Sequence, residues 1–514
     1  MRFLEAGKSG KVLYFSLIFP RYQDVKSLYP SVQIKYDYPV GLPRIHVWDP
    51  KYYPCNRHAG PERGNSFDFD VCDCAHRIPI HGTQIVNDVE WTAEQAMSDD
   101  FFGFACVSMF PPKNLFHPVL VQMDPDTHKC TASLNTILEG FFFTEEIKLA
   151  MKHGYILKRI HRFDQYHRGN IWRDFIQDLV ILKMSCERGV PSPEEQTRIA
   201  DAHTALGMRD KLIASFPSWS NSPAKKMGAK ITVNSVWGKH GQRPDMPKDV
   251  LIHDDDLTEY ARLMANVSSN LTDLHSFGSV GESRTHYKTS EVWTNRYRKH
   301  HGTYLPMAVA VPAYGRMVLY EQLAKLGDRV LYHDTDSVMY IWRPDMYNIP
   351  VSDTLGEWEV EKCDSAHGGL RSFVGIGPKS YGIQGLQPCS PSCGCDIREP
   401  GQRYTCIKVK GLSIKHSHRN MLNFDIFKET VLKYINDHVT PDPLFLPQYT
   451  FNYKMGEGIT TRYYLKRFAF QPELLKGKLH ESTVYPEGYC EGCIRGWMGQ
   501  DDHTCLTYRY QPFY

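Results

Sequence analysis

The sequence predicts an α+β protein built from several lobes. The chain has 514 residues, which is more than usually fold around a single hydrophobic core. Segments with helical periodicity lie at 144–153 and 172–186, and strand-like segments lie at 330–332 and 338–342. Long polar stretches with little periodicity separate these segments, which indicates inserted, loop-rich regions.

The composition excludes a disordered chain and gives no evidence of a membrane span. Hydrophobic residues make up 42% and charged residues 23%, which is typical of a globular protein. The net charge of +2 means that any nucleic-acid surface must be local. No segment approaches the ~20 apolar residues of a membrane helix. We expect an intracellular protein that is not secreted.

The first elements surround an aspartate and a proline. The apolar run 12–19 has no small-residue cleavage site, so it predicts a buried strand rather than a signal peptide. After it, Asp24 is expected at the strand end and Pro30 at a turn. Further along, Ser222 and Gly238 have the residue types expected at the start and the end of a helix.

Two aspartates stand at the tip of the predicted hairpin. Asp334 and Asp336 are flanked by apolar strands, so they are either solvated turn residues or ligands of a hard cation. Asp24 alone could be a strand-end cap. If its strand pairs beside the hairpin, Asp24 and Asp336 can share a pair of Mg²⁺ ions, as phosphoryl-transfer enzymes require.

A basic helix face is the third pattern. Lys226, Lys230 and Asn234 recur every four residues and share one face, with Val233 and Trp237 on a neighbouring stripe. Such a face is either simply solvated or suited to a triphosphate, whose transfer depends on charge stabilisation.

These patterns occur in the order that family B DNA polymerases show. Residues 24–31 resemble motif A (D-x-x-S-L-Y-P-S), 230–238 resemble motif B (K-x-x-x-N-S-x-Y-G), and 332–337 resemble motif C (Y-x-D-T-D-S). Residues 377–381 and 408–411 resemble the P-K-x-Y and K-x-K-G elements. The spacers around motif B are similar to those of the protein-primed branch, found in phages, adenovirus-like viruses and transposons.

The resemblance implies the right-hand fold of palm, fingers and thumb. It divides the chain into seven parts: the first part of the palm with motif A at 1–80, an insertion at 81–160, fingers with motif B at 161–240, an insertion at 241–303, the second part of the palm with motif C at 304–385, a Cys-rich loop at 386–405, and the thumb with a Cys/His cluster at 406–514.

The resemblance also implies a role for each matching residue. Asp24 and Asp336, with the Val25 carbonyl, are expected to hold two Mg²⁺ ions, and Asp334 to lie nearby. The expected dNTP-binding residues are Tyr29, which excludes a 2′-hydroxyl, Lys226, Lys230, Asn234, Trp237 and, by a loose alignment, Lys183. The expected DNA-binding residues are Lys379, Tyr381, Lys408, Lys410 and Arg316, the last of which could instead support the palm.

The chain departs from the family pattern in two places. Motif B usually ends Tyr-Gly, whereas this chain has Trp237, which keeps a stacking face and loses the hydroxyl. Few residues precede Asp24, where proofreading members carry an exonuclease domain, so proofreading is not expected from this chain.

Cysteine and histidine clusters are candidate structural zinc sites. The spacing of Cys490, Cys493, His503 and Cys505 suits Zn²⁺; two further sets surround positions 55–76 and 389–406. The alternative is that they are free cysteines in loops.

Primer–template DNA, dNTPs and a terminal priming protein are the expected partners. The competing hypothesis is a catalytically inactive DNA-binding relic of such a polymerase.

Overall fold

The computed structural model describes most of the chain. The described residues are 3–5, 19–49, 84–86, 88–123, 130–134, 137–187, 189–242, 248–253, 256–265, 269–277, 284–291, 304–361, 368–388, 403–414, 416–418, 420–437, 442–454, 458–469, 478–480, 483–486 and 489. Within these ranges no helix is both long enough and apolar enough to cross a membrane. Helices and strands are mixed along the chain, which confirms the predicted α+β class.

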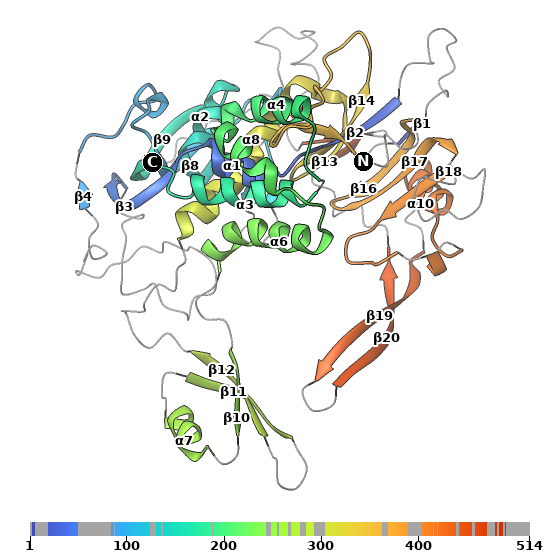
Figure 1. Cartoon of the computed structure of the whole chain (residues 1–514). Helices are drawn as coiled ribbons and strands as arrows, with labels where there is room; N and C mark the ends of the chain where they lie inside the picture. Colours follow the sequence, from blue (N-terminus) through green and yellow to red (C-terminus); the bar gives the residue numbers. More distant parts are fainter. Residues whose placement is uncertain are drawn as a thin grey trace.

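A four-stranded antiparallel sheet occupies the centre of the molecule (Figure 1). Its strand order is β13 (Val330–Asp334), β14 (Ser337–Trp342), β2 (Phe19–Val25) and β15 (Trp358–Val360). The predicted hairpin is therefore confirmed, and the strand carrying Asp24 pairs directly beside it.

Most of the strand predicted at 12–19 cannot be compared with the structure, because 12–18 lies outside the described residues. Within the described part, β2 begins at Phe19 and extends through Asp24, so Asp24 lies near the end of a strand as predicted. The polar residues after Pro20 gave no strand signal in the sequence. One of them, Gln23, is nevertheless fully buried and hydrogen-bonded inside the protein. Its side chain accepts a hydrogen bond from the Tyr340 hydroxyl at 2.7 Å. Pairing inside a sheet thus outweighed local polarity.

Two helices complete the central core. α1 (Leu28–Lys35) follows β2 directly, and α8 (Leu305–Leu326) packs against it. Pro30 was predicted at a turn, yet it lies in the first turn of α1, where a missing N–H costs no helical hydrogen bond. The core joins Leu28 and Val32 of α1 to Tyr314 of α8 and to the sheet.

A helical lobe covers the far side of α1. It contains α3 (Arg173–Ser185), α4 (Pro193–Ala202), α5 (Arg209–Ser215) and α6 (Pro223–His240). The helices predicted at 172–186 and from Ser222 are confirmed. The predicted end at Gly238 falls short, because α6 continues to His240.

A five-stranded sheet cuts across the predicted domain boundaries. Its order is β4 (Gln84–Val86), β3 (Tyr38–Val47), β9 (Ile156–Gly169), β5 (Gly103–Phe110) and β8 (Leu138–Phe143), and α2 (Thr144–Lys152) follows β8. β3 and β9 pair with each other, although the boundaries near 80 and 160 would assign them to different parts. Pairing between distant strands leaves no local signal in the sequence, which explains the difference.

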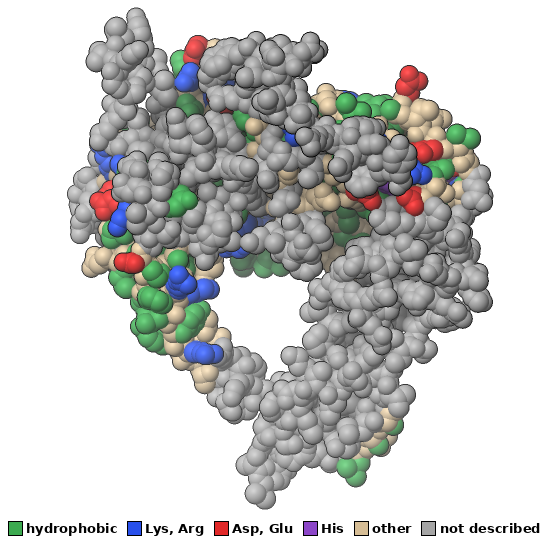
Figure 2. Space-filling view, turned by 180° about the vertical axis from the view of Figure 1, so that it is seen from behind, with side chains coloured by type: hydrophobic (Ala, Val, Ile, Leu, Met, Phe, Trp, Pro, Cys, Tyr) green, Lys and Arg blue, Asp and Glu red, His purple; other side chains and the backbone are tan. Residues whose placement is uncertain are grey.

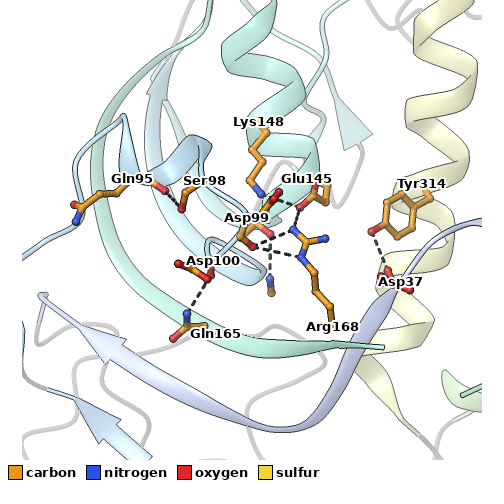
Figure 3. Close-up of polar contacts among 12 residues, drawn as sticks. Asp37, Gln95, Ser98, Asp99, Asp100, Glu145, Lys148, Gln165, Arg168 and Tyr314 are labelled. Carbon is orange, nitrogen blue, oxygen red and sulfur yellow. Dashed lines mark hydrogen bonds and ion pairs between the residues drawn. The ribbon is translucent and has the colours of Figure 1, made fainter. Parts of the chain in front are cut away.

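Charged contacts fix this sheet to α2 (Figure 3). Arg168 of β9 lies 2.9 Å from Glu145, which also contacts Lys148 at 2.9 Å. The Arg168 guanidinium stacks 3.9 Å from the centre of the Phe102 ring and donates to the Asp99 carbonyl. The helix predicted at 144–153 therefore begins beside a strand that it helps to hold.

A second four-stranded sheet leads into the C-terminal part. Its order is β1 (Phe3–Glu5), β16 (Leu370–Gly377), β17 (Ser380–Pro388) and β18 (Arg403–Lys408). α10 (Phe424–Asp437) packs on it, and the hairpin of β19 (Leu444–Lys454) and β20 (Gly458–Phe468) projects from the body (Figures 1 and 2).

The predicted insertion at 241–303 contains regular structure. It holds the three-stranded antiparallel sheet β10 (Lys248–His253), β12 (Arg284–Glu291) and β11 (Ser269–Phe277), with α7 (Leu257–Ala265). The remaining short pairs are β6 (Gln122–Met123) with β7 (Cys130–Thr131), and β21 (Lys478–His480) with β22 (Thr483–Tyr485). The expectation of irregular structure in this insertion was therefore wrong. Its strands are mostly polar and lack the apolar alternation that identifies a strand in the sequence.

Candidate active site

Asp24 and the hairpin aspartates meet at one end of the central sheet. Asp24 is opposite Ser337 of β14, the residue after Asp336, and opposite Glu359 of β15 on its other side. The Val25 N–H donates to the Asp336 carbonyl at 2.8 Å. The structure thus brings together residues that lie more than half the chain apart.

The charges at this end of the sheet are unbalanced. Burial, and then the neighbouring Asp336, Glu361 and Glu359, raise the pKa of Asp24 to about 7. Burial also raises the pKa of Asp336. The Asp24 Oδ1 atom is buried and accepts no hydrogen bond from the residues that the structure describes. An orphaned carboxylate oxygen among like charges fits a divalent cation.

The described residues do not form a closed metal cage by themselves. Among them, no three His, Cys, Asp or Glu side chains converge as a ready metal site. Mg²⁺ usually takes one or two protein carboxylates and fills its other positions with water and phosphate oxygens. The two-carboxylate arrangement therefore suits Mg²⁺ and leaves room for a substrate.

Strained backbone surrounds the aspartates. The described non-glycine residues with positive φ are Ser27 (57°), Thr335 (53°) and Lys379 (55°). Thr335 separates the two hairpin aspartates, Ser27 follows β2, and Lys379 lies in the turn between β16 and β17. For a β-branched residue such as Thr335 this conformation is a true outlier, and such strain concentrates at functional sites.

The P-K-x-Y and K-x-K-G elements lie beside the hairpin. Lys379 Nζ contacts Asp334 at 3.0 Å, and its N–H donates to the Tyr332 hydroxyl at 3.0 Å. Lys408 is opposite Tyr381 in the sheet and lies over its ring, and the Lys410 N–H donates to Ser380 Oγ. The two elements therefore form one basic edge, with Lys379, Lys408 and Lys410 exposed.

Four lysines gather on the opposite side of motif A. Lys183 of α3 donates to Ser27 Oγ at 2.8 Å. Burial lowers the Lys183 pKa, and the nearby Lys230, Lys26 and Lys226 lower it further, against the opposing effect of Glu187. Lys226 lies 3.4 Å from Glu187. The loosely aligned Lys183 thus contacts a residue within motif A itself.

The aromatic residues predicted around the nucleotide are in contact. The rings of Tyr29 and Trp237 lie 4.9 Å apart between centroids. The Trp237 indole N–H donates to the Ala308 carbonyl of α8 at 2.9 Å. Asn234 is exposed on the same helix, α6.

Arg316 has a structural partner. Its guanidinium holds Glu146 of α2 with bonds of 2.7 and 2.9 Å. Half of its side chain remains exposed, while Glu146 is nearly buried. This placement favours the supporting role over the DNA contact predicted as its alternative.

Sequence reasoning missed the acidic strand β15 and the loop before it. Glu359 and Glu361 are two residues apart in an extended segment, so their side chains lie on the same face. The negative charges of both carboxylates help to raise the pKa of Asp24. In the loop, the Gly356 N–H donates to the Lys26 carbonyl, and the Lys26 N–H donates to the Glu357 carbonyl. The period-two spacing of the glutamates was a usable signal. The zinc candidates Cys490, Cys493, His503 and Cys505 lie outside the described residues.

Curated proteins with related sequences are described as probable DNA polymerases. A "Probable DNA polymerase" of Neurospora intermedia is 23% identical over 344 residues, which are 65% of this chain and 28% of that protein. One of Ascobolus immersus is 21% identical over 412 residues, 80% of this chain and 25% of that protein. The chain is similar to DNA polymerases. It spans about a quarter of the length of these curated relatives.

Solved structures give a weaker likeness. The chain aligns with "Phi29 DNA Polymerase, orthorhombic crystal form" at 15% identity and a TM-score of 0.46, covering 88% of this chain and 58% of the other. A Phi29 DNA polymerase complexed with primer-template DNA and incoming nucleotide substrates aligns at 14% identity and a TM-score of 0.47 with the same coverage. No protein-family model matches the chain.

Proposed function

We propose that this chain is a DNA-directed DNA polymerase that adds dNTPs to a primer 3′-hydroxyl. The observation that carries the proposal is the meeting of Asp24 and Asp336, with an orphaned carboxylate oxygen, beside a group of lysines. Sequence similarity to proteins described as probable DNA polymerases supports it. The motif spacing favours a protein-primed family B enzyme of a viral or mobile element, working with a terminal priming protein.

The proposed architecture is a right hand. The central sheet with α1 and α8 would form the palm, the helices α3 to α6 the fingers, and the C-terminal part with the β19–β20 hairpin the thumb. The basic edge of Lys379, Lys408 and Lys410 faces solvent beside the hairpin aspartates, so primer–template phosphates could reach it.

Each residue near the site has a proposed task. Two Mg²⁺ ions bound by Asp24, Asp336 and the Val25 carbonyl would activate the primer hydroxyl and neutralise the leaving pyrophosphate. Lys183, Lys226 and Lys230 would neutralise the triphosphate and hold it in line. Tyr29 would exclude a 2′-hydroxyl, and Asn234 and Trp237 would pack over the new base pair.

Primer extension by the purified chain tests the proposal. We expect Asp336→Asn and Asp24→Asn to reduce extension in Mg²⁺ by on the order of 10²-fold or more, the loss of a major electrostatic stabiliser. Asp345→Asn is the matched control, because this exposed carboxylate lies past the opposite end of β14. Undiminished extension by both site variants would refute the mechanism. DNA binding without extension by the unmutated chain would favour the inactive relic.

A further inference from the structure

A proline inside α8 creates a hydrogen-bond acceptor next to the candidate site. Pro312 lies within the helix and has no N–H, so the carbonyl of Ala308, four residues earlier, lacks its usual helical donor. The indole N–H of Trp237 donates to this carbonyl at 2.9 Å. A side chain on α6 thus replaces the hydrogen bond that the α8 backbone cannot make.

This hydrogen bond lies in a tight contact between the two helices. The Tyr304 N–H at the start of α8 donates to the His240 carbonyl at the end of α6, at 3.2 Å. A Cβ atom on Gly241 would lie only 3.3 Å from the Ala308 Cβ. The backbones therefore already meet closely, and the indole has a fixed frame on which to bond.

The ring of Tyr29 is enclosed between the same two helices. On one side it contacts Trp237, with the ring planes tilted by 59°. On the other side, a Cβ atom on Gly315 of α8 would lie 3.1 Å from Tyr29 Cε1. Any rotation of the indole would therefore free one of the two surfaces that hold Tyr29.

We propose that Trp237 is a positioning residue that fixes the Tyr29 ring through the Ala308 carbonyl left free by Pro312, and so sets the discrimination between deoxyribonucleotides and ribonucleotides. The proposal rests on the proposed polymerase function. It also gives a physical reason for Trp at this position, because the indole N–H supplies a donor next to a flat stacking surface.

Trp237→Phe tests the proposal by keeping an aromatic ring and removing the N–H. We expect the ratio of kcat/KM for a dNTP to that for the matching rNTP to fall by about 2- to 10-fold, the range of one net hydrogen bond. Trp172→Phe is the matched control. Trp172 packs against the ring of His240, which lies on α6 as Trp237 does, and this variant should leave the ratio unchanged.

A thermal double-mutant cycle tests the hydrogen bond without DNA or nucleotide. We expect Trp237→Phe to lower Tm by a few degrees when Pro312 is present, since it orphans the Ala308 carbonyl. In a Pro312→Ala background the backbone N–H at position 312 can satisfy this carbonyl. The loss of Tm caused by Trp237→Phe should then shrink to half or less.

The two experiments separate failure of this inference from failure of the proposed function. If the unmutated chain extends no primer, the proposed function fails, while the thermal cycle still decides whether the Pro312-dependent bond exists. If extension persists and Trp237→Phe leaves the nucleotide ratio unchanged, the positioning role is overturned. Equal Tm losses in both backgrounds would overturn the hydrogen-bond account.

Discussion

Asp24 carries a charge that the folded protein does not neutralise. Its pKa rises from 3.8 to about 7, so the folded state binds a proton more readily than the unfolded chain does. By linkage, this group favours folding below its unfolded pKa, and the favourable contribution is lost as pH rises toward 7. A protein that tolerates such a cost near neutral pH commonly uses the carboxylate for function.

This reasoning gives a prediction for Asp24→Asn. In EDTA at pH 8, the free energy of unfolding of the variant should exceed that of the unmutated chain by about 1–2 kcal/mol. This difference is smaller than the full shift of the Asp24 pKa would give, because Asp24 is partly exposed and solvent screens its charge. The difference should disappear toward pH 4, where Asp24 is protonated. Urea unfolding at several pH values measures it.

Adding Mg²⁺ supplies the control. The cation would stabilise the unmutated chain more than the variant, so the difference at pH 8 should shrink or reverse. Asp345→Asn should show neither effect, since this carboxylate is exposed. A pH-independent difference between Asp24→Asn and the unmutated chain would contradict the linkage account.

Individual site residues were predictable where sequence spacing carried the signal. Asp24, Asp336, Lys226 and Lys230 lie in motifs and could be named in advance. Lys26 and Glu359 could not, because their place depends on the pairing of β15 with β2. The left-handed Ser27 and Thr335 were also unforeseen, since neither residue type favours that conformation.

At the scale of elements, the β19–β20 hairpin has two unlike faces. One face packs on α10 through Leu446 and Phe468. The other carries six large apolar side chains, each 50–77% exposed: Phe445, Tyr449, Phe451, Ile459, Tyr463 and Leu465. Neither strand contains an acidic residue. Arg467 lies on this apolar face, opposite Phe445, whereas Arg462 and Lys466 lie on the other face. Figure 2 shows Lys and Arg beside these apolar groups.

We predict that this exposed face contributes to DNA binding. Exposed aromatic rings beside cations suit unpaired bases and the nucleic-acid backbone. The double change of Tyr449 and Phe451 to Ala should weaken binding of a primer–template with a single-stranded overhang by about 5- to 50-fold, without lowering Tm. Fluorescence anisotropy measures it, and Thr450→Ala on the opposite face is the control. An unchanged Kd would show that the face serves another partner.

Elements were predictable where local patterns decide them. The helices α2 and α3 and the β13–β14 hairpin were expected at nearly their observed bounds. β2 and the start of α1 were not, because buried polar residues and a proline hide them in the sequence. The three-stranded sheet at 248–291 was missed for a related reason, since its strands carry few apolar residues.

At the scale of the whole molecule, one ion pair joins two large units. Arg316 lies on α8, which packs in the central core, and Glu146 lies on α2, the helix that follows β8 of the five-stranded sheet. We predict that Arg316→Met lowers the free energy of unfolding by about 1–3 kcal/mol, because it leaves the nearly buried Glu146 unpaired. Adding Glu146→Gln should recover part of this loss.

DNA affinity distinguishes this role from a template contact. If Arg316 mainly supports the fold, Arg316→Met should bind primer–template with an affinity within about 2- to 3-fold of the unmutated chain, measured on folded protein, and with the same salt dependence. A salt slope reduced by about one unit would instead restore the predicted phosphate contact.

The contact between α4 and the loop before β15 has a mechanical consequence. Arg198 of α4 pairs with Asp353 at 2.9 Å, and His203 accepts the Leu355 N–H. The same loop grips the backbone of Lys26, two residues from Asp24. The helical lobe is thus connected through α4 and this loop to the backbone beside Asp24, so a displacement of α4 would either break these contacts or move the strand that carries Asp24.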